Sequence, residues 1–328
     1  MNRRGFVRTA AGAAVMWPLR GFPQQPAKVR QVGLLSVGPP PSKGTVPPVV
    51  SETLRSLGYI EGHNIAYEVR YAAGQLEKVP SMAAELVQRK VEVIIVNGFR
   101  ALHAARTATS TVPIIIANGC GDAVATRVVA SLARPGGNVT GMSEEAVQLS
   151  AKRLEILKET LPKARKVAVL WNADDMAMSL RYQEIEKAAA ALRIEVQPLG
   201  VRGPDDFANA LAAMTRAKPD AVFLIADILT MLNRKRLLAY AAASHMPAMY
   251  EVSSVVREGG LMSYGSTQED GFRIAATYVD RILKGTKPAE LPVQQPTRYY
   301  LTLNLKTAAA LGVTIPPSVL LRADEVLQ

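Results

Sequence analysis

The stretch VRQVGLLS, residues 29–36, decides the fold because a similar stretch, RKVAVLWN, returns at residues 165–172. Three more pairs follow in the same order, and each is an apolar run that ends in a small or polar residue: VEVIIVNG (91–98) with DAVFLIAD (220–227), TVPIIIANG (111–119) with HMPAMYEVS (245–253), and PGGNVTGMS (135–143) with GGLMSYGS (259–266). A period this long indicates a duplicated domain rather than a solenoid of short repeats. The duplication predicts two similar lobes with a cleft between them.

Helical patterns separate the apolar runs, as in PSMAAELVQRKV (80–91) and SLRYQEIEKAAAALR (179–193). Short strands that alternate with longer helices are typical of βαβ units and a parallel sheet. We therefore predict an α/β fold of two Rossmann-like lobes with parallel sheets. The expected strands lie near 30–36, 64–70, 92–97, 112–117 and 138–142, then near 166–171, 193–199, 220–226, 247–250 and 260–264. A strand at 298–305 and a short helix at 306–312 have no counterpart in the first half.

The composition excludes several classes of protein. The chain has 328 residues, 48% apolar and 20% charged, which is enough for two domains with their own cores. The formal charge is +11, but four of the arginines lie in residues 1–27, which contain no acidic residue. Aromatic residues make up 5% and no long basic run occurs, so we predict no nucleic-acid partner. The single cysteine, Cys120, allows no internal disulfide.

The N-terminal segment has the pattern of an export signal. Arg3 and Arg4 precede Gly-Phe-Val, and the apolar stretch TAAGAAVMWPL follows at 9–19. A basic start followed by a short apolar run is typical of a signal peptide, and paired arginines are typical of the twin-arginine type. We predict a signal peptide over residues 1–27 and a periplasmic location. The alternative is a chance basic and apolar N-terminus on a cytosolic protein.

Polar residues follow the predicted strands in both halves. In an open parallel sheet, ligands bind outside the carboxyl ends of the strands. These side chains are therefore candidates for a site that binds a small polar or zwitterionic molecule. An alternative for each Asn, Asp or Ser is that it only caps the following helix. The candidates are Ser36, Gly98, Phe99, Arg100, Asp122, Asn172, Asp174, Asp227, Tyr250, Glu251 and Tyr264.

Signatures of catalysis and of cofactor binding are absent. The sequence contains no GxGxxG after the first strand, no GxxxxGK[ST], no HExxH and no GxSxG. The three histidines, His63, His103 and His245, lie far apart, and we predict no metal and no cofactor. Cys120 at a strand end could be a nucleophile with His103 as its base, or simply a small residue in a glycine-rich turn.

Stretches along nearly the whole chain resemble the substrate-binding proteins of ABC transporters that include the tryptophan-binding type. The resemblance is carried by QQPAKVRQVGLLS, LGYIEGHNIAYEVRYAAGQ, SLARPGGNVTGMS, AKRLEILKETLPKARKVAVLWN, REGGLMSYG and the final segment from YVDRILKGTKPAELP to LLRADEV. It implies a type I periplasmic binding protein, in which two lobes joined by three hinge strands close on a ligand. The implied crossings lie near 142–146, 264–267 and 293–298.

The resemblance implies lobe 1 over 28–143 and 266–295, and lobe 2 over 144–265 and 296–328. The sequence departs from the family pattern at Asn97-Gly98-Phe99-Arg100, where relatives show a Gly-Gly-Thr-Pro-like turn. Arg100 could bind a carboxylate in bidentate fashion, with Phe99 stacked on the ligand, or could lie on the helix surface. The remaining candidates would hold the ligand from both lobes, with Tyr250 or Tyr264 packed against it.

We therefore predict a monomeric, non-enzymatic solute-binding protein that delivers an amino-acid-like, carboxylate or aromatic ligand to an inner-membrane ABC permease. A sensory binding protein of the same fold, which reports its ligand to a membrane receptor, is the alternative of the same class. An exported α/β enzyme that uses Cys120 is the alternative of a different class. Replacement of Cys120 by serine separates the enzyme from the binding protein.

Overall fold

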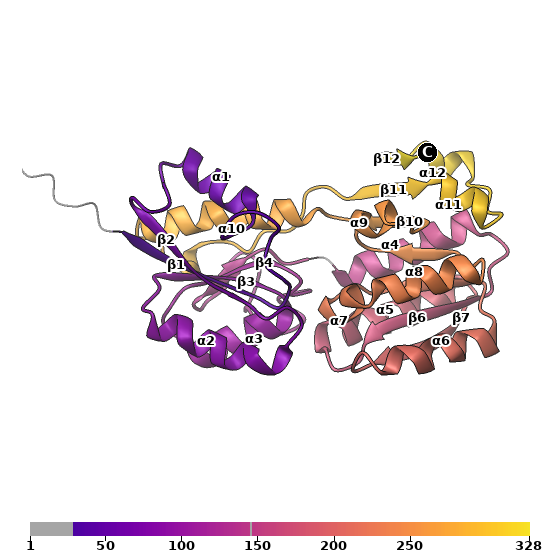
Figure 1. Ribbon diagram of the computed structural model, residues 1–328, viewed down its shortest axis with the longest axis horizontal. Coiled ribbons are helices and arrows are strands. Elements are labelled where there is room, and N and C mark those ends of the chain that lie inside the picture. Colours follow the sequence, from indigo (N-terminus) through magenta and orange to yellow (C-terminus); the bar gives the residue numbers. More distant parts are fainter. Residues whose placement is uncertain (1–28, 145) are drawn as a thin grey trace, which may run out of the picture.

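The computed structural model describes residues 29–144 and 146–328, which form two α/β lobes (Figure 1). Lobe 1, in violet at the left of the view, is built on a five-stranded parallel sheet in the order β2-β1-β3-β4-β5. Its strands are β1 (Arg30–Ser36), β2 (Ile65–Tyr71), β3 (Val93–Asn97), β4 (Ile114–Asn118) and β5 (Val139–Gly141). Its helices are α1 (Pro48–Ser56), α2 (Val79–Gln88), α3 (Phe99–Ala108) and α10 (Gln268–Leu283), with short 3-10 turns η1 (Leu76–Lys78) and η2 (Pro288–Glu290).

Lobe 2 is built on a seven-stranded sheet in the order β12-β11-β10-β9-β8-β6-β7. Its strands are β6 (Lys166–Asn172), β7 (Glu195–Val201), β8 (Ala221–Leu224), β9 (Ala248–Tyr250), β10 (Met262–Gly265), β11 (Tyr300–Asn304) and β12 (Glu325–Leu327). Its helices are α4 (Ala146–Thr160), α5 (Met176–Ala191), α6 (Asp206–Ala217), α7 (Ile228–Leu232), α8 (Arg234–Ala243), α9 (Ser253–Arg257), α11 (Leu305–Ala310) and α12 (Pro317–Leu320).

Helices cover both faces of each sheet, which explains why central strands such as β3, β4 and β8 are apolar along nearly their whole length. In β3, Ile94 and Val96 pack with α2 and α3, whereas Val93 and Ile95 face α1 and α10. All four of these side chains are fully buried. In lobe 2, α4 and α5 cover one face of the sheet, and α6 and α8 cover the other.

The chain passes between the lobes three times. The first passage leads from β5 to α4, the second from β10 to α10, and the third from Gln294 to β11. The first and third passages are hydrogen bonded to each other, because the Gln294 N–H donates to the Gly141 carbonyl at 2.8 Å and the Ser143 N–H donates to the Gln294 carbonyl at 2.8 Å. The second passage adjoins the third, because β10 and β11 are paired in lobe 2. The three passages therefore lie together at one side of the boundary between the lobes, which we call the hinge.

The structure confirms the predicted α/β fold with two lobes, and every predicted strand is found within two residues of its expected bounds. Two features differ from the prediction. The sheet of lobe 2 is not wholly parallel, because β11 runs antiparallel to β10, and the short strand β12 beside β11 was not predicted. The predicted signal peptide lies outside the described residues. Among the described residues, no helix has both the length and the apolar character needed to cross a membrane.

Candidate functional site

A cavity of about 460 Å³ lies between the two lobes, at the carboxyl ends of strands from both sheets. Its volume is within the usual range for small-molecule sites. Lobe 1 lines it with the ends of β1 to β4 and the start of α3, and lobe 2 with the ends of β6, β8 and β9. Polar lining residues are Ser36, Asn97, Arg100, Asn118, Glu144, Arg153, Asn172, Asp175, Arg181, Asp227, Glu251, Ser266, Thr267 and Gln268.

The strand order arranges the cavity lining from the hinge outward. In lobe 1, the order β2-β1-β3-β4-β5 places Tyr71 at one end of the lining and Glu144, just after β5, at the end nearest the hinge. In lobe 2, the order β9-β8-β6 places Glu251 nearest the hinge strand β10, followed by Asp227 and then Asn172. The cavity therefore has a hinge end and an outer end with different chemistry.

The outer end is apolar and is closed by direct contact between the lobes. Ile228 of α7 packs against the apolar core of lobe 1. At the other end of α7, a Cβ atom on Gly74 of lobe 1 would overlap Cδ1 of Leu232. An aromatic ring or an alkyl chain fits such walls better than a charged group does. The apolar lining comprises Pro39, Pro41, Pro47, Pro48, Tyr71, Leu76, Ile228 and Met231.

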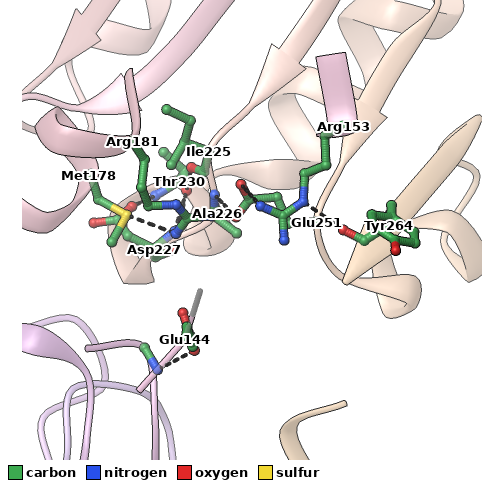
Figure 2. Close-up of polar contacts among 11 residues, drawn as sticks. Glu144, Arg153, Met178, Arg181, Ile225, Ala226, Asp227, Thr230, Glu251 and Tyr264 are labelled. Carbon is green, nitrogen blue, oxygen red and sulfur yellow. Dashed lines mark hydrogen bonds and ion pairs between the residues drawn. The ribbon is translucent and has the colours of Figure 1, made fainter. Parts of the chain in front are cut away.

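The hinge end contains a buried ion network of two arginines and one glutamate, all from lobe 2 (Figure 2). Glu251 lies between Arg153 of α4, at 3.0 Å, and Arg181 of α5, with which it forms a very short ion pair. The Ala226 N–H also donates to Glu251 at 3.0 Å. Arg153 donates through Nε to the Tyr264 carbonyl at 2.6 Å, so the network reaches the end of β10.

Burial and charge act in opposite directions on this network. Burial alone would raise the pKa of Glu251, but Arg153 and Arg181 lower it below its usual value. Burial lowers the pKa of Arg153, whereas the charge of Glu251 opposes that shift. An arginine keeps its proton under either influence, so the network carries one net positive charge. Arg153, Arg181 and Glu251 are only 3–6% exposed, and they hold this charge at the cavity wall.

Glu144 lies across the cavity from the network, in the first passage between the lobes (Figure 2). Its Oε1 accepts a hydrogen bond from the Gly119 N–H at 2.8 Å. Its negative charge acts on Arg153 and Arg181 and tends to raise the pKa of each. The hinge end of the cavity thus presents a cationic wall on lobe 2 and an anionic side chain opposite it.

The middle of the cavity is lined by strand-end residues that are bonded in pairs. Ser36 accepts a hydrogen bond from the Asn97 side-chain amide at 3.2 Å. Asn172 donates to Asp227 at 2.5 Å, and Asp227 also caps α7 through the Thr230 N–H at 2.8 Å. These side chains are therefore held in fixed positions by the protein itself.

Asp175 caps α5 from the cavity side, where its carboxylate accepts hydrogen bonds from the Ala177 N–H at 2.9 Å and the Met178 N–H at 3.3 Å. Burial raises the pKa of Asp175 to about 6, and the charge of Asp227 adds to the shift. The two aspartates give lobe 2 an acidic region between the network and the outer end.

Helix α3 starts at the cavity without a side-chain cap. Its N-cap residue is Gly98, with φ of 104°, so its first N–H groups and the positive end of its dipole face the cavity unshielded. Phe99 packs against the cores of both lobes, which fits its position at their boundary. Arg100 also bridges the lobes, because its Nη2 donates to the Asp174 carbonyl at 3.4 Å.

Seven of the eleven predicted site residues line the cavity: Ser36, Gly98, Phe99, Arg100, Asn172, Asp227 and Glu251. Several of them also have the structural role that we weighed against binding. Asp227 caps a helix, and Glu251 uses both carboxylate oxygens to hold the two arginines. Glu251 therefore forms the cavity wall mainly through the guanidinium groups that it positions.

The other four predicted residues do not line the cavity, and their positions correct our expectation. Asp122 accepts hydrogen bonds from the Val124 and Ala125 N–H groups and stabilises its own turn. Asp174 forms an ion pair with Arg202 at 3.3 Å on the surface. Tyr250 is 1% exposed in the core of lobe 2, because its side chain points to the α6 and α8 face of the sheet. Tyr264 contributes its carbonyl to Arg153, while its ring packs against the other core of lobe 2.

Sequence reasoning missed Arg153 and Arg181 because it considered only residues that directly follow strands. It missed Glu144, which comes just after β5, because residues 142–146 were considered only as a passage between the lobes. Arg153 and Arg181 lie within helices, at least one turn from the strand ends. The sequence did contain a signal, since Arg181 falls between Ala177 and Ile185 at the four-residue spacing of a buried helix face. A basic residue on such a face needs an acidic partner or a ligand.

Cys120 is not placed for nucleophilic chemistry. Its side chain is 1% exposed, and its Sγ donates to the Asn118 carbonyl at 3.5 Å. Burial raises the pKa of the Cys120 thiol well above its usual value, and the charge of Glu144 adds to the shift. The thiolate that a nucleophile requires is therefore disfavoured.

Two α/β lobes, three passages at one hinge and a cavity between the lobes define the periplasmic binding protein fold, a class that encloses a small solute. The chain matches the family described as "ABC transporter substrate binding protein" over residues 41–327, and it belongs to that family. It is the solute-binding component of an ABC transporter, not an enzyme, and the family places it among extracytoplasmic binding proteins.

Three relatives illustrate the match. The tyrosine-binding protein of Clostridioides difficile strain R20291 is 25% identical over 288 residues, which cover 87% of this chain and 82% of the relative. The ABC domain in complex with L-Trp from Streptococcus pneumoniae superposes with a TM-score of 0.84 at 25% identity, covering 92% of this chain and 100% of that one. The structure of a conserved domain protein from Vibrio cholerae superposes with a TM-score of 0.83 at 25% identity, covering 91% and 100%.

Proposed function

We propose that the chain binds an aromatic amino acid between its two lobes and delivers it to an ABC permease. One observation carries the proposal: a single cavity has a charged hinge end and an apolar outer end. An aromatic amino acid has the same division, with a zwitterionic head at one end and a ring at the other. Two relatives support this ligand class, one called a tyrosine-binding protein and one solved in complex with L-Trp.

In this proposal the head of the ligand lies at the hinge end and its ring lies near Tyr71 and Met231. The strand-end residues Ser36, Asn172 and Asp227 then contact the ligand between these ends, and the free N–H groups of α3 lie beside it. A ligand in this position touches both lobes, so its binding favours their closed arrangement over an open one.

The proposal also includes the predicted division of the chain and its export. Lobe 1 comprises residues 28–143 and 266–295, and lobe 2 comprises residues 144–265 and 296–328. Residues 1–27 act as a twin-arginine signal peptide, and the mature chain works in the periplasm as a monomer beside its permease. The paired arginines Arg3 and Arg4 and the apolar stretch after them support this route.

Isothermal titration calorimetry tests the ligand class. The protein is unfolded and refolded to remove any bound solute, then titrated with L-tyrosine, L-tryptophan and L-phenylalanine, with L-alanine and L-glutamate as controls for the ring. We expect binding of at least one aromatic amino acid and no heat from L-alanine. The bound ligand should also raise the melting temperature by mass action, with about 2.7 kcal/mol of stabilisation at 100 times Kd. Equal binding of L-alanine, or no binding of any aromatic amino acid, contradicts the proposal.

A further inference from the structure

The ion network at the hinge end has one donor group that no described residue engages. Arg153 uses Nε for the Tyr264 carbonyl and Nη1 for Glu251. Within residues 29–144 and 146–328, no hydrogen bond is recorded for its Nη2, and in Figure 2 this end of the guanidinium points toward the gap that separates it from Glu144. Arg153 is 4% exposed and lines the cavity, so its free face is directed at the cavity interior.

The positive charge of the network is also not fully neutralised. Among the described residues, Glu251 is the only carboxylate bonded to the two arginines, and both of its oxygens are engaged by Arg153, Arg181 and the Ala226 N–H. Two guanidinium groups therefore share one carboxylate, and the Nε of Arg181 is buried without a partner among the described residues. A buried charge that lacks a counter-ion is costly, so an anionic group in the cavity would stabilise the network.

Glu144 offers the complementary charge on the opposite wall. One of its oxygens is held by the Gly119 N–H at 2.8 Å, and no bond is recorded for the other in the described part of the chain. A carboxylate oxygen that is free, partly buried and fixed in direction is a good acceptor for an ammonium group. The fixed oxygen prevents Glu144 from turning away into solvent.

We propose that Arg153 binds the α-carboxylate of the ligand through its free Nη2 and that Glu144 binds the α-ammonium group. The inference rests on the proposed function, and it specifies that the site requires both charges of a zwitterion. It also assigns the carboxylate of the ligand to Arg153, which lies within α4 and neither follows a strand nor starts α3. A simpler account is that Glu144 only neutralises the network through space and never touches a ligand.

Ligand analogues distinguish these accounts in the unmodified protein. Tyramine lacks the carboxylate of L-tyrosine, and 3-(4-hydroxyphenyl)propionate lacks its ammonium group. A hydrogen bond to a charged partner is worth a factor of about 10 to 100 in affinity. We therefore expect each analogue to bind about 10 to 100 times more weakly than L-tyrosine. If L-tyrosine and L-tryptophan do not bind at all, the proposed function fails and the analogues give no reading of the subsites.

Two variants then assign the charges to residues. We expect Glu144→Gln to weaken L-tyrosine about 10-fold to 100-fold and to leave the propionate analogue within twofold, because that analogue has no ammonium group. Arg153→Lys should weaken both L-tyrosine and the propionate analogue and leave tyramine within twofold. Glu155→Gln, on the exposed face of α4 and paired with Lys152, is the matched control and should change none of these affinities.

The pattern of losses decides the outcome. If Glu144→Gln weakens L-tyrosine and the propionate analogue equally, Glu144 acts on the network through space and the assignment is overturned. If it changes neither, Glu144 has no part in the site. Thermal unfolding of each variant without ligand separates a loss of binding from a loss of folding. If Arg153→Lys does not fold, the analogue series and Glu144→Gln still test the inference.

Discussion

Removal of the Leu232 side chain should weaken ligand binding although Leu232 does not line the cavity. Leu232 ends α7 in lobe 2, and its Cδ1 lies against Gly74 of lobe 1, at the side of the cavity opposite the hinge. Complete burial of a leucine side chain is worth about 1.5–3 kcal/mol. Leu232 remains 47% exposed, so its contact with lobe 1 contributes about 1 kcal/mol at most. Because only the closed arrangement makes this contact, Leu232→Ala should raise Kd by up to about fivefold.

Calorimetric titration with L-tyrosine measures this effect. The matched control is Leu321→Ala, which removes a leucine that is 86% exposed, and it should leave Kd unchanged. Stopped-flow measurements should show that the weaker binding results from faster dissociation of the ligand, since the contact forms after the ligand is bound. An unchanged Kd for Leu232→Ala, or an equal change for Leu321→Ala, refutes the view that this contact stabilises closure.

The reverse change, on Gly74, provides a second test of the same contact. Gly74 has φ of +86°, a conformation that costs an alanine roughly 1 kcal/mol. That strain acts in open and closed forms alike, so it lowers thermal stability without a large effect on Kd. The overlap of a new Cβ with Leu232 acts only on closure. Gly74→Ala should therefore weaken L-tyrosine binding in the wild-type background and have little effect on Kd in Leu232→Ala, a coupling that a double-mutant cycle measures.

Three further predictions concern the interior of the protein. Glu251→Gln leaves Arg153 and Arg181 without their shared carboxylate, and it should lower the free energy of urea unfolding by about 3–5 kcal/mol; a loss below 1 kcal/mol contradicts the role of this network. Asp175 has its pKa raised to about 6 in the folded state by burial and by Asp227, against about 3.9 when unfolded, so the folded protein holds this proton more tightly. The tighter proton stabilises the folded state by up to about 3 kcal/mol; this contribution is full below pH 4 and is lost as the pH rises through 6. Asp175→Asn keeps a helix cap and should remove that pH dependence in urea titrations. Cys120→Ser should leave L-tyrosine affinity unchanged, because the buried thiol contacts the Asn118 carbonyl and has no role in chemistry; a tenfold loss of affinity contradicts this.

Periodicity predicted the central strands because they are covered on both faces. A strand such as β3 must then be apolar throughout, and its end is marked by the first polar residue, Asn97. Strand β12 gave no such signal, because its three residues lie at the edge of the sheet and none of them is buried. Helix α5 starts at Met176, three residues before the predicted start at residue 179, and the Asp175 side chain caps it.

The rule that ligands lie at strand ends identified most of the middle of the cavity, where backbone geometry alone positions Ser36, Asn172 and Asp227. It failed at Tyr250 because neighbouring residues on a strand point to opposite faces, and Tyr250 points into a core while Glu251 reaches the cavity. The rule also cannot find Arg153 or Arg181. Their place in the site depends on how α4 and α5 pack on the sheet, which strand periodicity does not describe.

The position of the ion network relates ligand binding to the hinge. Arg153 is bonded to the Tyr264 carbonyl, one residue before β10 ends and the chain crosses to lobe 1. Glu144 lies in the first passage between the lobes, beside the segment that carries the third. A zwitterion held between Arg153 and Glu144 would thus link two of the three passages directly, whereas its ring would reach the outer end that Leu232 and Gly74 close. Loss of either charge should therefore impair closure as well as affinity, while Leu232→Ala should impair closure and leave the preference for a zwitterion intact.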